Sequence, residues 1–166
     1  LEKNKRSNFF LIFYFNISSS NMGIDFWGPR VWRLMHLASY YYSDHPNQEQ
    51  LQIFKFFYTV IIPNIIPCPK CQRHYLKNLQ ELPVRLKNRH KLIRWVVDIH
   101  NRVNTLKSKP LISYETSDKV YRDKNFEDDI KSLNKYFRKR MVNRRLSSAM
   151  YNNYVIFVRQ IYPQLF

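Results

Sequence analysis

Glycine is scarce in this chain, with only two among its 166 residues. Tight β-hairpins and phosphate-binding glycine loops both depend on glycine, because it adopts positive φ angles without steric cost. No GxGxxG or GxxxxGK[ST] pattern occurs, which argues against a Rossmann dinucleotide fold and a P-loop. A many-stranded barrel is disfavoured on the same ground, and we expect an all-helical protein.

Acidic residues are also few, at 12 Asp+Glu against 28 Lys+Arg, which leaves a net charge of +16. The basic excess is spread along the chain and is dense only at residues 138–140 and 144–145. Such a charge attracts phosphate groups, so nucleic-acid binding is expected as a secondary property, with a solubilising surface as the alternative. Hydrophobic residues make up 45% of the chain, enough for a packed core, so a wholly disordered basic tail is excluded.

Long hydrophobic runs are missing as well. The apolar run at residues 9–15 is far shorter than the ~20 residues that a membrane-spanning helix needs, so we expect no transmembrane segment. Met22 stands five residues before a strong motif, so residues 1–21 are interpreted as an upstream extension. A targeting or membrane-contact segment remains the alternative for this stretch.

Apolar residues recur at helical spacing through the rest of the chain. Val31, Leu34, Met35 and Ala38 follow the i, i+3, i+4, i+7 pattern, and Pro29 is expected in the first turn of their helix. Further helices are expected over about 48–62, 68–79, 92–106 and 114–123, with one or two more over 126–166. We predict a four- or five-helix bundle over residues 22–124, followed by a basic helical extension over residues 125–166.

Only two cysteines are present, and they form the motif Pro67-Cys68-Pro69-Lys70-Cys71. The prolines predict a helix that begins near Cys68. A helix start places unpaired backbone N–H groups and the positive end of the helix dipole beside the first sulfur. Both features stabilise a thiolate, the form that carries out dithiol–disulfide exchange.

Three interpretations of the pair remain open: simple packing, zinc binding and redox chemistry. A zinc site would combine Cys68, Cys71 and His74 with a fourth ligand from His36, His90 or His100, although the usual second ligand pair is absent. A redox pair on a helical bundle needs an electron acceptor, because no side chain passes two electrons to oxygen unaided. A cofactor such as a flavin is therefore implied.

Three groups of residues, taken together, resemble a known family. They are Trp27-Gly28-Pro29-x-x-Trp32-x-x-x-His36, then the CxxC, then Trp95 followed by His100-Asn101-x-Val103-Asn104 and Lys109-Pro110. Their order and separations over residues 26–122 resemble the Erv/ALR family of FAD-linked sulfhydryl oxidases. The compact form is most similar to members found in large DNA viruses.

The resemblance implies a helical bundle that holds FAD at its mouth, works as a homodimer, and oxidises thiols to disulfides while reducing oxygen to hydrogen peroxide. It implies that Cys71 lies against the flavin ring and that Cys68 exchanges with the substrate thiol. The cofactor-binding residues that it implies are Gly28, Trp32, His36, Trp95, His100, Asn101, Val103, Asn104, Lys107 and Lys109.

Some of these residues have a simpler interpretation. The two tryptophans suit a core, and His36 suits a buried, hydrogen-bonded histidine. His100 and Asn104 lie on an otherwise apolar helix face, where polar groups cost free energy unless they find partners. A bound nucleotide would supply such partners, and Lys107 and Lys109 would neutralise its pyrophosphate.

The sequence also departs from the family pattern. Ile66 and Pro29 stand where many members carry Tyr and Arg, and no third cysteine is present. Cys68 is therefore expected to take electrons directly from a thiol-bearing partner protein, such as a thioredoxin-like carrier. We expect it to act in the cytoplasm, or at the site of virion assembly if viral. The competing hypotheses are a zinc or nucleic-acid-binding module around Cys68, Cys71 and His74, and a structural scaffold or capsid protein.

Overall fold

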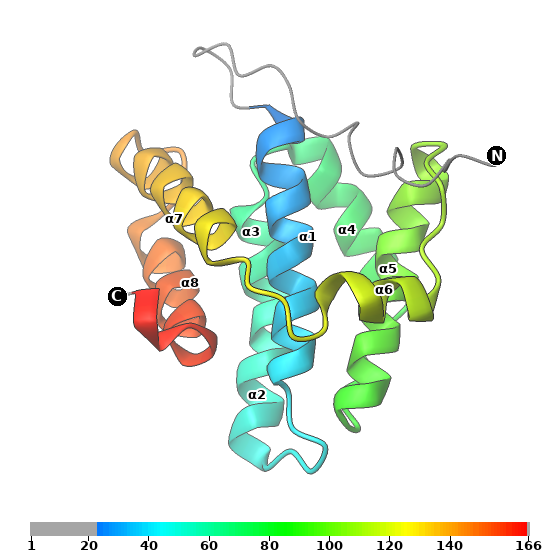
Figure 1. Ribbon diagram of the computed structural model, residues 1–166. Helices are drawn as coiled ribbons and strands as arrows, with labels where there is room; N and C mark the ends of the chain where they lie inside the picture. The colour runs from blue at the N-terminus through cyan, green and yellow to red at the C-terminus, as the bar shows by residue number, and fades with distance from the viewer. Residues whose placement is uncertain (1–22, 166) are drawn as a thin grey trace, which may run out of the picture.

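The computed structural model describes residues 23–165, which fold into helices with no strand among them (Figure 1). The expected upstream segment at residues 1–21 lies outside the described residues. The α-helices are α1 (Ile24–Tyr41), α2 (Gln48–Phe56), α3 (Ile62–Ile65), α4 (Pro69–Glu81), α5 (Arg89–Leu106), α6 (Tyr114–Tyr121), α7 (Glu127–Val142) and α8 (Ser148–Ile161). Helix α1 runs through the middle, with α5 and α6 on one side and α7 and α8 on the other (Figure 1). The all-helical prediction is confirmed.

Helix α1 begins earlier than the sequence predicts. The Gly23 carbonyl accepts the N–H groups of Phe26 and Trp27 at 2.9 and 3.3 Å, which forms a first turn ahead of Pro29. Pro29 therefore lies inside the helix, and the prediction that it occupies the first turn is wrong. The additional turns position Ile24 and Gly28 beside the site described below.

Helices α2 and α3 are joined without a break by a π-helical turn, η1 (Phe57–Ile61). The prediction that this helix ends at about residue 62, just before Pro63, is wrong, because the helix continues through Pro63 to Ile65. In a regular α-helix the proline ring clashes with the carbonyl four residues earlier. The wider π turn just before Pro63 relieves that clash.

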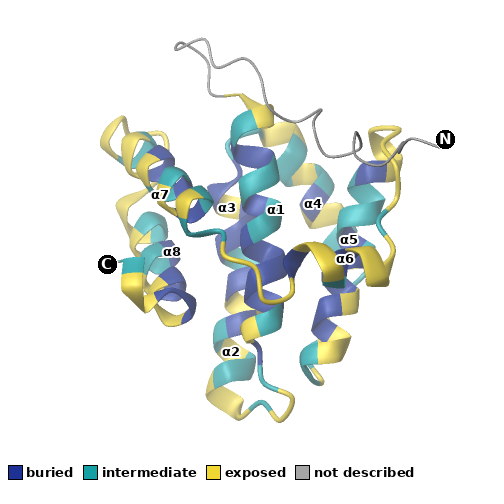
Figure 2. Ribbon diagram, viewed as in Figure 1, coloured by how far each residue is buried: buried dark blue, intermediate teal, exposed yellow. Residues whose placement is uncertain are grey.

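Helices α7 and α8 share the core of the rest of the molecule. Phe157 of α8 stacks on Phe57 with ring centroids 3.8 Å apart, and both side chains are buried. The buried faces of α7 and α8 point toward the central helices (Figure 2). Asp129 of α7 forms ion pairs with Arg30 and Arg33 of α1 at 3.3 and 2.9 Å. The basic extension therefore packs into the helical bundle and contributes to its core.

Within residues 23–165, none of the helices combines the length and the apolar character needed to cross a membrane.

Candidate active site

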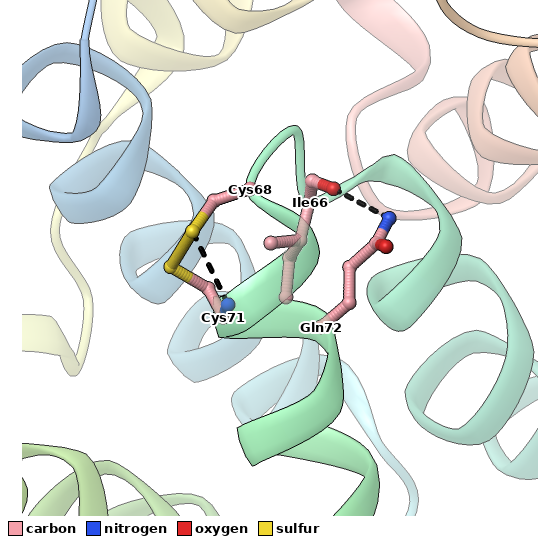
Figure 3. Close-up of a disulfide and its surroundings, with 4 residues drawn as sticks. All are labelled: Ile66, Cys68, Cys71 and Gln72. Carbon is pink, nitrogen blue, oxygen red and sulfur yellow. Dashed lines mark hydrogen bonds between the residues drawn. A yellow bond between two sulfur atoms is a disulfide. The ribbon is translucent and has the colours of Figure 1, made fainter.

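Cys68 and Cys71 form a disulfide at the N-terminus of α4, with Cα atoms 5.1 Å apart (Figure 3). Cys68 is the N-cap residue, and its Sγ accepts the Cys71 backbone N–H at 3.2 Å. Gln72 Nε2 donates to the Ile66 carbonyl at 2.8 Å, which ties the first turn to the end of α3. The predicted helix start at the CxxC is confirmed, and the positive end of the helix dipole faces the sulfurs.

Cys71 lies in the wall of a cleft between α1, α4 and α5. The cleft contains about 590 Å³ of space free of protein atoms, including the solvent at its mouth. Its walls are largely apolar. They are formed by Ile24, Trp27, Gly28, Val31, Trp32, Met35, Ile66, Cys71, His74, Tyr75, Val103, Leu106 and Lys107. Leu106, the last residue of α5, is 58% exposed at this wall.

A buried pair of histidines lies behind Trp32. His36 Nε2 and His100 Nδ1 are 3.1 Å apart, and the His100 ring stacks on Trp32 with centroids 4.0 Å apart. The His36 ring stacks on Tyr121 at 3.9 Å and is fully buried. Burial, followed by the nearby His100, lowers the pKa of His36 well below its usual value. Burial, followed by Lys109, lowers the pKa of His100 to about 4, so both rings are neutral at pH 7.

Polar groups of α6 extend this pair toward the surface. Ser117 Oγ lies 3.4 Å from His36 Nδ1. Burial, followed by the hydrogen bond to Asp118, raises the pKa of Tyr40, while nearby Ser117 acts in the opposite direction. The Tyr40 hydroxyl donates to Asp118 Oδ1 at 2.6 Å. A continuous row of polar groups therefore joins the histidines to a carboxylate on α6.

Two lysines meet where α5 ends. Ser108 adopts φ 51°, which turns the chain and lets the Lys109 N–H reach the Asn104 carbonyl at 2.8 Å. Burial, followed by the charge of Lys109, lowers the pKa of Lys107, while Asp25 acts in the opposite direction. The positive charges of Lys107 and Lys109 repel each other, and a bound anion would relieve this repulsion.

Not all of the residues implied by the resemblance meet at the cleft. Gly28, Trp32, Val103 and Lys107 line it. His36 and His100 lie behind Trp32, and Lys109 lies near His100.

The remaining three are engaged elsewhere. Trp95 is fully buried and donates its indole N–H to the Leu82 carbonyl at 3.0 Å, as a core residue would. The Asn101 amide pairs with both backbone groups of Ile112 at 2.8 Å, and Asn104 Nδ2 donates to the Pro110 carbonyl at 3.2 Å. Asn104 therefore does not need a ligand as its polar partner, contrary to the sequence-based expectation, because the chain's own backbone supplies one.

The proposed zinc site is not assembled. Cys68 and Cys71 are joined to each other. Across the part of the chain that the structure describes, no three His, Cys, Asp or Glu side chains come close enough to hold a metal ion. His74 does lie near the dithiol, on the cleft wall beside Cys71.

Several cleft residues carry no site prediction from the sequence: Ile24, Trp27, Val31, Met35, Ile66, Tyr75 and Leu106. The α1 members among them lie three, four or seven residues from Gly28 or from each other, so helical periodicity around the WGP motif could have found them. Ile66 departs from the family pattern, and because it lies on the cleft wall, this departure changes the site itself.

The chemistry of the cleft fits FAD. The apolar walls suit a flat aromatic ring, and Cys71 supplies a sulfur at the same surface. A Cβ atom built at Gly28 would meet only Ile24 Cγ1, at 3.6 Å, so this wall has room for a close approach. Lys107 and Lys109 offer positive charge for a diphosphate.

Comparisons with known proteins agree with this geometry. The sequence model of the Erv1 / Alr family matches residues 29–127. An FAD-linked sulfhydryl oxidase of African swine fever virus is 31% identical over 96 residues, which cover 57% of this chain and 79% of that protein. A probable FAD-linked sulfhydryl oxidase of Acanthamoeba polyphaga mimivirus is 32% identical over 92 residues, covering 53% of this chain and 63% of that protein.

The similarity of the fold to solved structures agrees with the sequence comparisons. The crystal structure of the FAD binding domain of Erv1 from Saccharomyces cerevisiae matches with a TM-score of 0.55 and 29% identity, over 58% of this chain and 90% of that one. The family model spans more than half of the chain, and the chain belongs to the Erv1 / Alr family.

Proposed function

We propose that this chain is an FAD-dependent thiol oxidase that catalyses 2 R-SH + O₂ → R-S-S-R + H₂O₂. One observation carries the proposal: the disulfide has one cysteine, Cys71, in the wall of a cleft that fits a flavin. FAD, when bound there, supplies the capacity to take two electrons from the dithiol and pass them to oxygen. The residues to hold it are the cleft lining, with Lys107 and Lys109 beside the diphosphate.

The two cysteines divide the exchange chemistry between them. A substrate thiolate attacks Cys68 Sγ, the Sγ–Sγ bond breaks, and Cys71 leaves as a thiolate. A second substrate thiolate then attacks the substrate sulfur of this mixed disulfide, the substrate disulfide forms, and Cys68 leaves. Two electrons have then moved from substrate to the cysteine pair.

The start of α4 prepares these sulfurs to leave as thiolates. The Cys71 N–H already points at Cys68 Sγ, and the helix dipole adds a positive partial charge there. Lys70 and Arg73 increase the positive potential around the pair. His74 lies on the same cleft wall as Cys71, where its ring is placed to help hold a thiolate.

The partner in this scheme is a thiol-bearing protein. The chain's only cysteines are the reacting pair, so we expect Cys68 to take electrons directly from that protein, for which a thioredoxin-like carrier is suited. We also propose that the chain works as a homodimer. Nucleic-acid binding stays a secondary expectation from the +16 charge.

We place this activity in the cytoplasm, or at a virion assembly site if the source is viral. The viral relatives support that placement.

The visible absorption spectrum of the purified protein tests the proposed function. We expect a flavin spectrum that bleaches when dithiothreitol is added without air and returns when air is admitted. A fully folded protein that takes up no FAD would overturn the proposal.

A further inference from the structure

A second, shallower depression lies on the outer side of the active-site helix. It is a groove between η1–α3 and α4, lined by Thr59, Val60, Pro63, Asn64, Gln72 and Leu76. Gln72 follows Cys71 directly, and its side chain points away from the disulfide (Figure 3). The groove therefore begins one residue from the reacting sulfurs, on the side away from the cofactor cleft.

The floor of this groove is partly apolar and open to solvent. Leu76 is 44% exposed, and Phe56, one helical turn before Val60, is 41% exposed. Pro63 also lines the groove, although it is itself buried. These features suit an extended polypeptide better than a small ion.

The charge around the groove has one sign. Residues 50–80, which build both of its walls and the CxxC, contain no Asp or Glu. Lys70 and Arg73 are both exposed and lie three residues apart on α4, so they share a face of the helix. Arg73 is likewise three residues from Leu76, which places the basic stripe along the edge of the groove.

The proposed oxidase reaction makes a surface near Cys68 necessary. The cleft side of the disulfide is reserved for the cofactor, so a protein thiol must approach Cys68 from outside. The groove and the basic stripe are the features that such a partner meets on α4.

We propose that this groove docks the polypeptide substrate and selects cysteines that lie in acidic segments. The inference rests on the proposed thiol oxidase function and names its substrate class. Asp and Glu side chains beside the substrate cysteine face Lys70 and Arg73, while apolar side chains of the same segment cover Val60, Pro63 and Leu76. Docking raises the local concentration of the substrate thiolate at Cys68 Sγ, and the exchange steps are those given above.

Peptide pairs and a charge-reversal variant test this inference. The FAD-loaded full chain is assayed by oxygen consumption with three substrates: a dithiol peptide flanked by Asp and Glu, the same peptide with Asn and Gln, and dithiothreitol. We expect kcat/KM for the acidic peptide to exceed that for the neutral one by about tenfold at low salt, and the ratio to fall as salt rises. In Lys70→Glu/Arg73→Glu the ratio should fall to one or below.

Oxidation of dithiothreitol reports how charge reversal affects the cysteine chemistry itself. The ratio of kcat/KM between the acidic and the neutral peptide then reports the effect on docking. The matched control is Lys135→Glu/Arg138→Glu, which reverses an exposed Lys and Arg three residues apart on α7 and should leave the ratio unchanged. Leu76→Ser should lower kcat/KM for both peptides but not for dithiothreitol, whereas Val142→Ser, at a more exposed apolar position on α7, should lower none of them.

Two results are decisive. Equal kcat/KM for the acidic and neutral peptides in the wild-type chain, with dithiothreitol oxidised normally, overturns the docking inference and leaves the oxidase function intact. No oxygen consumption with dithiothreitol by the FAD-loaded chain overturns the oxidase function instead.

Discussion

The two cysteines occupy different surroundings although only two residues separate them. Cys71 lines the cofactor cleft, whereas Cys68 caps α4 and is absent from the described lining. Position in the helix start explains the difference, because the N-cap residue lies outside the helical turn and Cys71 lies within it.

This asymmetry predicts different trapping behaviour for single substitutions. In Cys71→Ser the free Cys68 thiolate attacks a disulfide probe such as glutathione disulfide, one glutathione thiolate leaves, and the mixed disulfide at Cys68 remains because Cys71 is not there to resolve it. Cys68→Ser leaves only the thiol on the cleft wall, which the probe reaches less readily. We expect both variants to retain FAD and lose oxygen consumption, and intact-mass measurement to find the mixed disulfide mainly in Cys71→Ser. Equal trapping in both would contradict the assignment of Cys68 as the entry point.

The buried histidine pair predicts how stability depends on pH. The folded pKa of His100 is lowered from 6.5 to about 4 by burial and Lys109, and that of His36 is lowered by burial and His100. As the pH falls below 6.5, the unfolded chain binds protons that the folded chain does not bind, so the free energy of unfolding decreases. His100 alone contributes a decrease of about 3 kcal/mol between pH 6.5 and 4.

Urea unfolding at a series of pH values measures this dependence. His100→Gln should flatten the curve between pH 6.5 and 4, while His45→Gln, at an exposed position, should leave it unchanged. A curve that keeps its slope in His100→Gln would show that other groups carry the effect.

At the scale of elements, the π turn and α4 depend on each other. The Ile62 N–H bonds to the Phe57 carbonyl, five residues back, so the next donor in that register would be residue 63. Pro63 has no N–H, and the Tyr58 carbonyl is left without its helical partner. The Tyr75 hydroxyl donates to it at 2.9 Å, and burial raises the pKa of Tyr75, which keeps that donor protonated.

Tyr75→Phe should therefore destabilise the contact between η1 and the helix that carries the CxxC. The Tyr58 carbonyl becomes a buried acceptor without a donor, at a cost of about 1–2 kcal/mol. Tyr41→Phe is the control, since Tyr41 is 52% exposed. Chemical unfolding measures both, and an equal small effect in the two variants would argue against this role for Tyr75.

At the scale of the whole molecule, α7 and α8 lie almost entirely beyond the family match at residues 29–127 and yet complete the core. Ile130, Leu133 and Phe137 of α7 are fully buried, as is Tyr154 of α8. In the sequence, a boundary at residue 124 separates the region that matches the family from the extension. In the structure, residues on both sides of this boundary share one hydrophobic core.

Phe157→Ala tests whether α7 and α8 unfold together with the rest of the chain. Removing the ring that stacks on Phe57 should lower the free energy of unfolding of the whole chain by about 3–5 kcal/mol, in a single transition. Ile156→Ala, the adjacent position at 57% exposure, should have little effect. If the flavin-binding part unfolded at its original denaturant concentration in Phe157→Ala, α7 and α8 would be a separate unit.

Much of this protein follows from local patterns that need no tertiary information. Scarce glycine and helical spacing predict the helices, because backbone propensity and the 3.6-residue period act within one segment. The place of the CxxC at a helix start follows from its flanking prolines. The joint spacing of the three motifs identifies the family, because together they are more specific than any one of them.

Other features depended on contacts between distant segments. Pro63 continues the helix because a π turn precedes it and Tyr75 supplies the missing donor. Asn101 and Asn104 face the backbone of residues 110–112 rather than the cleft, since the turn at Ser108 brings that backbone back to α5. The basic extension belongs to the core because Phe157 of α8 stacks on the apolar ring of Phe57. Periodicity shows which face of a helix is apolar, but only the tertiary structure decides what packs against it.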